Sequence, residues 1–464
     1  MQIMLVLPPH SLEDRYGRGI SKATGTLPPL GILYLAAYLK KDGHDVSVID
    51  GSVESCRVLS DALKKKKPHV IGISVPTFHW QKAVKIIDAA KKEFPGTLIV
   101  AGGPHPTFCP RQCFVDAPLL DAVVMGEGEI TLLEVCRAFS SGRTFDGIAG
   151  LAFRTGDGGI KVNEPRQPIV ELDKVPFPAR ELIDLYRYKP AIEQYRKTPV
   201  TNIISSRGCP SRCIFCMHVV GEAIRYRSPQ GIIDEIEFLL RNHGIKEIDF
   251  WDDTITVDRN RIFEMCRLMR QKNLDIIWSA QARVDTVDTQ MLKEMKSAGC
   301  WKLFFGIESL LQKNLDALKK GTTVEQALDA VKRTKQAGIE VEASFIFGIP
   351  GETYEEARED AFRIIRLNPD YIKCFPLTPL PGTELYVNVG KYGKLLTENL
   401  DDFTENKVVF VPYAMTERQL MELIPSTYKR FYLRPSYILG YISKMRSFED
   451  LERGIRGAMA MVGL

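Results

Sequence analysis

Three cysteines stand close together on one short segment of the sequence. They lie in SSRGCPSRCIFCMH at 205–218, as Cys209, Cys213 and Cys216, with the spacing C-x3-C-x2-C. Thiolates at this spacing can each hold one iron of a cubane iron–sulfur cluster, and the segment has no fourth cysteine. One iron would then keep an open position where a small molecule can bind and react. The alternatives are three unrelated thiols, or a zinc site completed by His218, although this spacing is unusual for zinc.

The cysteine segment follows the first of six short apolar runs that alternate with helical patterns. The predicted strands are Thr201–Ser205, Glu247–Trp251, Ile276–Ala280, Lys302–Ile307, Glu340–Phe347 and Tyr371–Phe375. Six strand–helix units over residues 199–388 predict a partial (β/α)6 TIM-type barrel, with six units where a full barrel has eight. Such barrels carry their chemistry at the C-terminal ends of the strands, which is where the cysteines stand.

A second alternating series occupies residues 1–144. Its predicted strands are Ile3–Leu7, Val46–Ile49, Val70–Ser74, Leu98–Ala101 and Ala122–Met125, with helical patterns between most of them. Buried apolar strands that alternate with helices predict an α/β fold with a doubly wound, Rossmann-like parallel sheet. For residues 145–198 we predict a linker with a small hairpin, and for residues 389–464 a mostly helical region.

Composition excludes several classes of protein. The chain has 464 residues, of which 45% are apolar and 26% charged, as in a soluble globular protein of about three domains. A net charge of +4 is too small to indicate nucleic-acid binding by itself. No run reaches the roughly 18 apolar residues that a membrane-spanning helix needs, and the N-terminus has no signal-like leader. We therefore expect a cytoplasmic protein whose reduced thiols serve metal binding or catalysis.

The three cysteines at the end of the first barrel strand resemble the radical S-adenosylmethionine (SAM) superfamily. The resemblance implies a [4Fe–4S] cluster on Cys209, Cys213 and Cys216, with SAM chelating the open iron through its amino and carboxylate groups. It also implies a one-electron reductant such as flavodoxin or ferredoxin. One electron from the cluster would cleave SAM to a 5′-deoxyadenosyl radical.

Other segments match this superfamily in the order of its strands. The implied SAM contacts are Phe215, Gly348 and Pro350 near the adenine, Asp252 and Asp253 at the amino group, Ser279 and Arg283 at the carboxylate, and Glu308 at the ribose. The sequence lacks the GGE motif that often follows the second strand, and Asp-Asp-Thr stands there instead, as in the cobalamin-linked branch. Alone, the aspartates could be caps, Arg283 a surface ion pair and Glu308 a helix N-terminal carboxylate. Their shared position at strand ends favours the cofactor interpretation.

The N-terminal sheet resembles the cobalamin-binding domain that precedes the barrel in this branch. Loops that follow the strands of an open sheet line its ligand crevice, and glycines there let a large flat ring approach the backbone. The implied cobalamin contacts are Pro8, Pro9, Leu30, Gly31, Ser74, Thr77, Gly102, Gly103, Pro104, His105, Gly126 and Glu127. The alternatives are a sheet that binds nothing or binds substrate, and a loop histidine at 105 that is satisfied within the protein.

One motif of other cobalamin proteins is incomplete. Cobalamin mutases ligate cobalt through the histidine of D-x-H-x-x-G, but here Asp42-Gly43-His44 is followed by Ser47 where the glycine should stand. The segment also precedes a predicted strand, whereas the motif follows one. We therefore expect His44 at the edge of the sheet opposite the crevice, and no protein histidine on the cobalt.

Taken together, the resemblance implies an enzyme that uses a [4Fe–4S] cluster, SAM and cobalamin to functionalise an unactivated carbon. Methylation of a small-molecule or lipid-like substrate is the preferred prediction. The alternatives are an oxidative cyclase of the magnesium-protoporphyrin ester type, a ring-rearranging enzyme, and a non-catalytic corrinoid sensor. The basic and aromatic stretch at 428–437 suits a membrane interface or a lipid substrate, or else an amphipathic helix packed on the barrel, so peripheral membrane association stays open.

Overall fold

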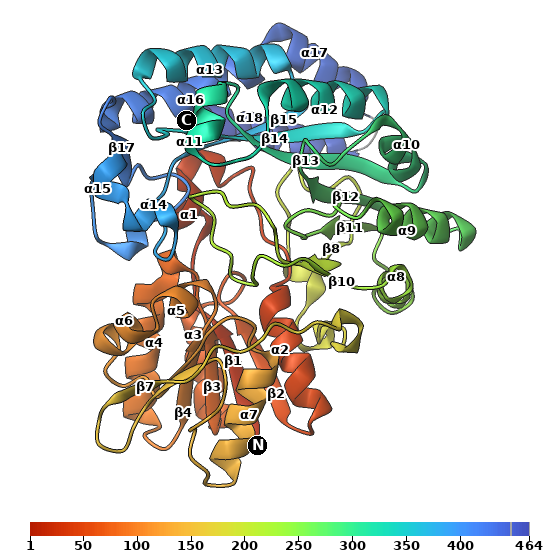
Figure 1. Ribbon diagram of the computed structural model, residues 1–464. Helices are drawn as coiled ribbons and strands as arrows, with labels where there is room; N and C mark the ends of the chain where they lie inside the picture. Colours follow the sequence, from red (N-terminus) through yellow and green to blue (C-terminus); the bar gives the residue numbers. More distant parts are fainter. Residues whose placement is uncertain (446–447, 464) are drawn as a thin grey trace.

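The computed structural model describes residues 1–445 and 448–463, which form two parallel sheets with helices packed on their faces (Figure 1). The N-terminal sheet lies in the lower half of that view and the second sheet in the upper half. This arrangement confirms the predicted α/β fold class with a parallel sheet in each half. None of the helices in the described residues combines the length and apolar composition that crossing a bilayer requires.

The N-terminal sheet has the strand order β2-β1-β3-β4-β5-β6-β7. Its first five strands run parallel: β1 (Gln2–Leu7), β2 (Asp45–Asp50), β3 (Val70–Ser74), β4 (Leu98–Gly102) and β5 (Ala122–Val124). The order reverses between β1 and β3, and open sheets bind ligands beyond the strand ends at such a point. His44 precedes β2 and lies beside the N-terminal amine of Met1, at the opposite edge of the sheet, as the sequence predicted.

Helices cover both faces of this sheet because apolar side chains alternate between the two faces of each strand. One face packs under α2 (Leu30–Lys41) and α7 (Glu129–Ser140). The other face packs under α3 (Cys56–Lys66), α4 (Trp80–Glu93) and α6 (Pro110–Asp116), with the short α5 (Pro104–Phe108) before α6.

The predicted hairpin forms, and it extends the N-terminal sheet. β6 (Leu151–Arg154) and β7 (Ile160–Val162) are antiparallel, and β6 pairs with β5. Residues that the sequence assigns to a linker therefore share a sheet with the first 144 residues. The following segment contains only 3-10 helices, at Leu172–Lys174, Arg180–Leu182 and Leu185–Arg187. The domain boundaries themselves stay a prediction, since a shared sheet does not show where an independently folding unit ends.

The second sheet contains six parallel strands in the order β15-β14-β13-β12-β11-β8. They are β8 (Val200–Ile203), β11 (Glu247–Phe250), β12 (Ile277–Ala282), β13 (Cys300–Glu308), β14 (Glu340–Phe347) and β15 (Tyr371–Pro376). The intervening helices are α8 (Pro229–His243), α9 (Arg259–Gln271), α10 (Thr289–Ser297), α11 (Gln312–Ala317), α12 (Val324–Gln336) and α13 (Tyr354–Leu367). The edge strands β8 and β15 do not pair with each other, so the barrel is partial as predicted.

Capping side chains set where these helices begin. Ser228, Asp258 and Asp288 accept backbone hydrogen bonds at the N-termini of α8, α9 and α10. Thr323 and Thr353 form reciprocal capping boxes with the third residues of α12 and α13. Each cap accepts hydrogen bonds from backbone N–H groups that have no partner within the helix, and so fixes where the helix begins. Each of these helices starts after a loop that follows the C-terminal end of a strand.

The C-terminal region contains an antiparallel pair that the sequence did not predict. β16 (Gly393–Leu395) pairs with β17 (Phe410–Pro412), next to the short α14 (Glu384–Val387) and α15 (Val389–Tyr392). A 3-10 helix at Leu400–Asp402 joins the two strands, and another at Thr77–His79 precedes α4. The remainder is helical: α16 (Glu417–Tyr432), α17 (Pro435–Lys444) and α18 (Phe448–Val462).

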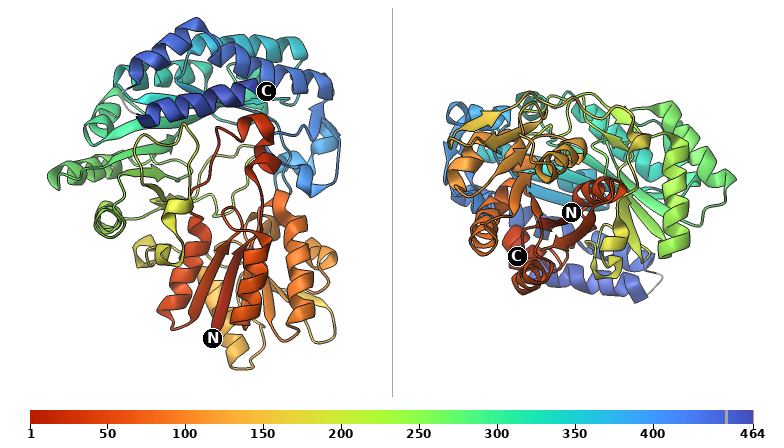
Figure 2. Two further views of the ribbon diagram at one scale, coloured as in Figure 1. Left: turned by 180° about the vertical axis from the view of Figure 1, so that it is seen from behind. Right: turned by 90° about the horizontal axis from the view of Figure 1, so that it is seen from below.

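The last helix packs against the first. α1 (Leu12–Ile20) begins at a capping box made by Ser11 and Asp14. α1 contacts α18, and Arg456 of α18 donates hydrogen bonds to the carbonyls of Lys22 and Thr24. In the rear view the N-terminus lies at the bottom of the molecule, whereas the C-terminus lies near the top, beside α1 (Figure 2).

A buried ion triad joins the segment after the first sheet to the second sheet. Glu235 of α8 is 0% exposed and accepts from Arg180 and Arg227, whose side chains are 1% and 8% exposed. Arg180 also donates to the carbonyl of Asn202 in β8 at 2.7 Å. Buried charges are tolerated only when paired, so the triad must form as a unit.

Glu235→Ala should lower the free energy of unfolding by about 3–5 kcal/mol, because it leaves two buried guanidinium groups without their carboxylate. Glu237→Ala on the same helix is the matched control, because Glu237 makes only partly exposed pairs with Lys272 and Arg241 and should cost about 1 kcal/mol or less. Urea unfolding followed by circular dichroism measures both variants. Equal losses in the two would contradict the role of the triad.

Candidate active site

The cysteine loop is held between two short antiparallel strands. β9 (Ser206–Arg207) and β10 (Arg225–Tyr226) pair with each other and bracket the loop. Inside the loop, Ile214 donates its N–H to the carbonyl of Leu318 at 3.1 Å and accepts the N–H of Leu385 at 2.9 Å. These bonds attach the loop to the segment after α11 and to α14, so the second half of the barrel positions the cysteines.

The three thiols suit a cluster better than a single ion. In the described part of the chain, no three His, Cys, Asp or Glu side chains converge on one point. A mononuclear zinc site needs such convergence, whereas each cysteine of a cubane cluster binds its own iron. Cys209 and Cys216 line a common cavity, and Cys213, which is 9% exposed, is not part of that lining. This donor set fits a [4Fe–4S] cluster with one iron lacking a protein ligand.

Two cations and one carboxylate stand beside the cysteine loop. Arg283, after β12, donates to Ser211 Oγ at 2.7 Å and to Asp285. Lys320, after α11, bonds to Glu308 Oε1 at 2.7 Å. Burial raises the pKa of Cys213, and both cations oppose that shift, which places their charges near the thiol. Burial would lower the pKa of Lys320, but Glu308 and Cys213 outweigh it and raise that pKa.

Glu308 adopts an unusual backbone conformation at the end of β13. Its φ is +68°, and the strand register shifts between Gly306 and Glu308. A Cβ at Gly306 would stand 2.6 Å from Glu308 Oε1, so a side chain there would have to displace the carboxylate. Left-handed backbone at a non-glycine residue is strained and concentrates at functional sites. The sequence indicated Glu308 but gave no sign of Lys320, which no motif singled out.

The two aspartates after β11 have different environments. Asp252 is 1% exposed and accepts the N–H of Ser205 at 2.6 Å and the hydroxyl of Ser206 at 2.8 Å. Its carboxylate therefore holds the turn from β8 into β9. Asp253 lines the cavity beside Cys209 and Cys216, and burial raises its pKa. Of the two, only Asp253 is free to meet a ligand there.

The remaining predicted SAM residues lie either beside the cysteine loop or within the second sheet. Ser279 donates to Asp249 Oδ1 at 2.7 Å within the sheet and so faces the interior. Phe215 packs on an apolar cluster that includes Ile346 and Ile349. Gly348 begins the loop after β14 with a φ of +83°, and Pro350 follows in the same loop.

Glu352 shapes this loop, and no pattern in the sequence pointed to it. It accepts the backbone N–H groups of Gly348 at 2.8 Å and Ile349 at 3.1 Å, and the side-chain amide of Asn314 at 2.8 Å. The carboxyl is fully buried, and burial raises its pKa to about 7. Because all three donors converge on one side chain, the loop is fixed at the end of β14.

Half of the predicted cobalamin residues line the cavity at the edge of the N-terminal sheet. They are Gly31, Ser74, Gly102, Gly103, Gly126 and Glu127. A Cβ at Gly103 would lie 2.8 Å from the backbone nitrogen of Val75, so the close approach of these two loops requires glycine. Gly103 has a φ of +93°, which also favours glycine. Bare backbone on this edge fits the flat face of a corrin ring.

The other predicted cobalamin residues do not line that cavity: Pro8, Pro9, Leu30, Thr77, Pro104 and His105. His105 is 2% exposed in α5, and its ring lies 5.0 Å from that of Trp80 on the far face of the sheet. Neither ring nitrogen has a hydrogen-bond partner, and burial lowers its pKa to about 4. The alternative from the sequence was a loop histidine whose ring is hydrogen-bonded within the protein. His105 does not match that alternative either.

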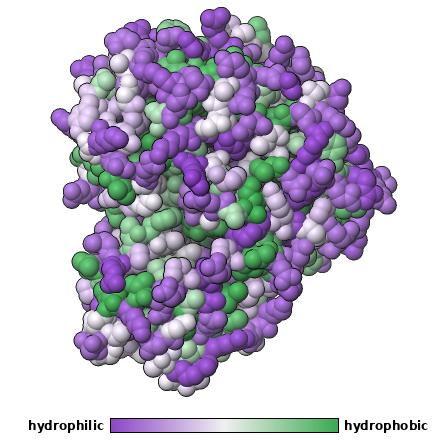
Figure 3. Space-filling view, in the orientation of Figure 1, coloured by the Kyte–Doolittle hydropathy of each residue, from purple (hydrophilic) through white to green (hydrophobic). Residues whose placement is uncertain are grey.

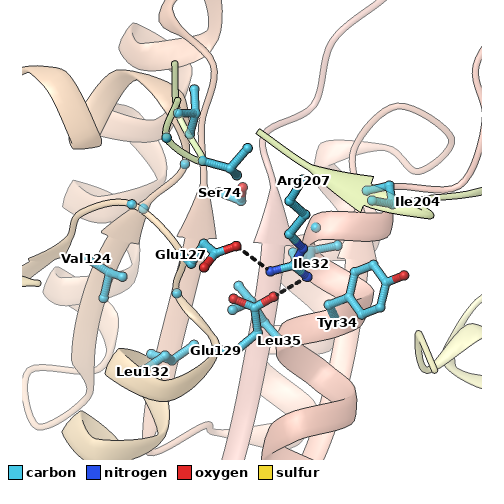
Figure 4. A pocket seen from close by; sticks show the side chains of 18 of the residues that line it. Ile32, Tyr34, Leu35, Ser74, Val124, Glu127, Glu129, Leu132, Ile204 and Arg207 are labelled. Carbon is cyan, nitrogen blue, oxygen red and sulfur yellow. Dashed lines mark hydrogen bonds and ion pairs between the residues drawn. The ribbon is translucent and has the colours of Figure 1, made fainter. Parts of the chain in front are cut away.

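Arginines from the second sheet reach the edge of the first. Figure 4 shows Arg207 between Glu127 and Glu129, at 2.9 Å and 2.7 Å. Arg225 adds a second bond to Glu127 at 2.8 Å, and Arg207 stacks 5.2 Å from the ring of Tyr34. Arg207 is 9% exposed and its two carboxylate partners are nearly buried, so this network is a desolvated contact between the two halves.

A single cavity of about 360 Å³ spans this junction. Its lower wall is the glycine-rich edge of the N-terminal sheet, and its upper wall is the cysteine loop with Trp251 and Asp253. A hydropathy view of the surface shows a hollow at the waist between the two halves, where apolar and polar residues meet (Figure 3). Ligands held on the two walls would face each other across one space.

Two family models match the chain in the same order as these two halves. The B12 binding domain matches residues 19–136, and the Radical SAM superfamily matches residues 203–364. An uncharacterized methyltransferase of Pyrococcus horikoshii is 36% identical over 465 residues, which cover 99% of this chain and 98% of that protein. The anaerobic magnesium-protoporphyrin IX monomethyl ester cyclase of Rubrivivax gelatinosus is 29% identical over 92% of this chain and 78% of that protein.

A solved structure shares the whole fold. The radical SAM methyltransferase TsrM from Kitasatospora setae, with cobalamin and a [4Fe–4S] cluster bound, superposes with a TM-score of 0.71 at 17% identity and covers 100% of this chain and 98% of that one. The order of the two domain matches agrees with the positions of the three-thiol loop and the glycine-lined sheet edge. The relative that aligns over its full length agrees with them too. The chain thus belongs to the cobalamin-dependent radical SAM enzymes, whose cofactors are a [4Fe–4S] cluster, SAM and cobalamin.

Proposed function

We propose that this enzyme transfers a methyl group to an unactivated carbon of a small-molecule or lipid-like substrate. The observation that carries the proposal is the single cavity shared by the cysteine loop and the edge of the N-terminal sheet. A hydrogen atom can be removed and a methyl group delivered at one carbon only if both cofactors reach the same space. The Pyrococcus horikoshii relative and TsrM are both named as methyltransferases, which supports this assignment.

The bound groups supply the chemistry: an electron to cleave SAM, an adenosyl group that takes a hydrogen atom, and a methyl group from cobalamin. Overall, one substrate C–H, two SAM and two electrons would give one C–CH3, one methionine, one 5′-deoxyadenosine and one S-adenosylhomocysteine. We propose that the electrons come from a flavodoxin or ferredoxin.

The residues around the cysteine loop would bind and orient SAM. We assign the SAM carboxylate to Arg283 and Lys320, because both cations stand beside the loop, whereas the hydroxyl of Ser279 donates to Asp249. Glu308 would accept ribose hydroxyls, and the bond from Lys320, which holds its carboxylate at the end of β13, supports this assignment.

The amino group and adenine of SAM would meet neighbouring residues. Asp253, not Asp252, would accept the amino group, because it lines the cavity with the cysteines. The aromatic ring of Phe215 and the backbone of the loop at 348–350 would exclude water from the adenine. Glu352 acts as a positioning residue for that loop through its bonds to two backbone N–H groups.

For cobalamin, the edge of the N-terminal sheet offers bare backbone. The loops at 102–103 and 126–128 approach the cavity with glycines, and His105 lies on the other face of the sheet. Among the described residues, the histidine that lines this cavity is His218, which comes from the cysteine loop and not from the sheet. The sheet-edge loops would hold cobalamin, which would supply the methyl group there.

A cyclase is the second candidate, because the Rubrivivax gelatinosus relative aligns over most of both chains. A sensor that binds corrinoid without catalysis is less consistent with the geometry, since Arg283, Glu308 and Lys320 all stand beside the cysteines. The three functions differ in their products, so product analysis separates them.

Methyl-deuterated SAM distinguishes these candidates. The reconstituted enzyme is incubated with this SAM, a one-electron reductant and a lipid and small-molecule extract of cells that lack the enzyme. Methylation predicts a labelled product together with equal amounts of 5′-deoxyadenosine and S-adenosylhomocysteine, measured by mass spectrometry. An unlabelled product with 5′-deoxyadenosine but no S-adenosylhomocysteine would indicate the cyclase instead, and absence of all three would indicate the sensor.

Replacing Cys209, Cys213 and Cys216 together by Ala should remove the cluster, because no described side chain can substitute for the three thiolates. Iron in the reconstituted protein should fall from about four atoms per chain to background, and 5′-deoxyadenosine should no longer form. Cys113→Ala, a buried thiol of α6, is the control and should keep both. Continued cleavage of SAM in the triple variant would overturn the cluster assignment.

Arg207→Met should weaken cobalamin binding about tenfold or more. Without the guanidinium group, the nearly buried Glu129 has no cation, and Glu127 keeps only one of its two arginine partners. The contact that holds the two walls of the cavity together is therefore weakened. Titration with hydroxocobalamin, followed by absorbance, measures the effect without turnover. Arg212→Met is the control, because its side chain is 80% exposed in the same loop. Equal affinities for the two variants would show that the junction does not shape the cobalamin site.

A further inference from the structure

A larger cavity, of about 750 Å³, lies between the second sheet and the C-terminal helices. Its volume falls within the roughly 300–1,000 Å³ typical of small-molecule sites. Side chains of β11 to β15 form one wall, and α1, α16, α17 and α18 form the others. In the rear view of Figure 2 the last helix crosses in front of the second sheet and ends beside α1. None of the SAM or cobalamin residues named above is part of its lining.

Oppositely charged side chains are paired at the inner end of this cavity. Lys302 bonds to Glu342 and to the carbonyl of Glu193 at 2.6 Å. Lys373 stands 2.8 Å from Glu342 and 3.1 Å from Glu193. Asp249, Arg15, Glu405 and Arg453 also line the cavity, so its lining carries four cations and four carboxylates in all. These leave no excess charge to hold an ionic group, while their polar atoms can still exchange hydrogen bonds. This end suits an uncharged polar group such as a hydroxyl or an amide.

The outer end of the same cavity is apolar and open to solvent. Four branched aliphatic side chains both line it and remain exposed: Ile438 at 43%, Ile442 at 55%, Leu451 at 44% and Ile455 at 54%. They come from α17 and α18, whose tyrosines and methionines continue the lining inward. A cluster of exposed aliphatic side chains around an opening marks a site for apolar surface. The cavity thus changes from polar inside to apolar at its mouth.

Trp251 connects this cavity to the cofactor cavity. It is the one residue among those described that lines both. Its indole N–H donates to Asp249 Oδ2 at 2.8 Å, and Asp249 is buried with Ser279 on its other oxygen. Lys302 acts electrostatically on Asp249, so the polar inner end is also the end nearest Trp251.

We propose that the larger cavity holds the methyl acceptor, and that this acceptor is an elongated amphipathic molecule with an uncharged polar end. The polar end lies among Lys302, Glu342 and Lys373, and the apolar body extends past α17 and α18 to the mouth. The methylated carbon lies near the polar end, because Trp251 stands between that end and the cofactors. This inference rests on the proposed methyl transfer and names the substrate class for it.

Isothermal titration of the reconstituted holoenzyme with 1-decanol tests the proposal. We expect saturable binding of 1-decanol and about tenfold weaker binding of decanoate, which brings an uncompensated charge to a balanced site. No binding of 1-decanol, or tighter binding of decanoate, would overturn the inference. Either result could coexist with labelled product from methyl-deuterated SAM, so this test and the test of methyl transfer fail independently.

Matched variants at the mouth locate the binding site. Ile442→Glu should weaken 1-decanol binding about tenfold, whereas Leu439→Glu should not, because Leu439 is 67% exposed on the same helix but does not line the cavity. Ile455→Glu and Met459→Glu repeat the comparison on α18, where Met459 is 48% exposed outside the lining. Thermal unfolding confirms that each variant is folded. Equal losses within each pair would place the alcohol on the surface of the helices and contradict the proposal.

Tryptophan emission reports on the inner end. Of the four tryptophans, Trp80, Trp278 and Trp301 are at most 3% exposed, whereas Trp251 is 39% exposed. Added 1-decanol should therefore change the emission of the full chain before cobalamin is loaded, and Trp251→Phe should abolish that change. An identical change in the variant would show that the alcohol does not reach the polar end.

Discussion

The ion pairing of Arg207 with Glu127 and Glu129 is the contact on which the cofactor cavity depends. Arg207 ends the strand that leads into the cysteine loop, while both carboxylates follow the last parallel strand of the N-terminal sheet. Nearly buried charges without partners would cost several kcal/mol, so the two halves can close in only one relative position. The guanidinium groups of Arg207 and Arg225 therefore help to set the distance between the cysteine loop and the sheet edge. Chemistry at one carbon by two cofactors requires such a fixed distance.

Much of this architecture could be predicted from local patterns. The strands at 70–74 and 340–347 were predicted to the residue, because both segments are rich in branched or aromatic apolar residues and are bounded by polar or glycine-containing sequence. The order of motifs behind Cys209, Cys213 and Cys216 led to the correct superfamily, since a loop at each strand end must lie on one face of a barrel. Helix α1 was missed although Leu12, Tyr16 and Ile20 stand at helical spacing, because Gly17 interrupts this short segment with a non-helical backbone.

Two residues beside the cavities were not singled out as site residues from the sequence. Lys320 and Trp251 belong to no motif: Lys320 bonds to Glu308 from the loop after α11, and Trp251 donates to Asp249 of the strand that precedes it. For the cobalamin loops, in contrast, residues were predicted to line the crevice and do not. Thr77 and His105 follow strands as predicted, but each lies in a helical turn that packs on the other face of the sheet. The sequence of a loop indicates at which edge of the sheet its residues lie. It does not indicate on which face they lie, because that depends on the side on which the following helix packs. His105 accordingly lies against Trp80 and not in the crevice.

The packing of α18 on α1 has a consequence for how the enzyme is made. The two helices come from opposite ends of the chain, and both wall the larger cavity. During synthesis, the N-terminal sheet and the parallel strands can collapse in order as they emerge, because their contacts join neighbouring units. The larger cavity cannot be completed until the final helix has left the ribosome. The protein thus assembles the two halves that hold its cofactors before it finishes the chamber beside them.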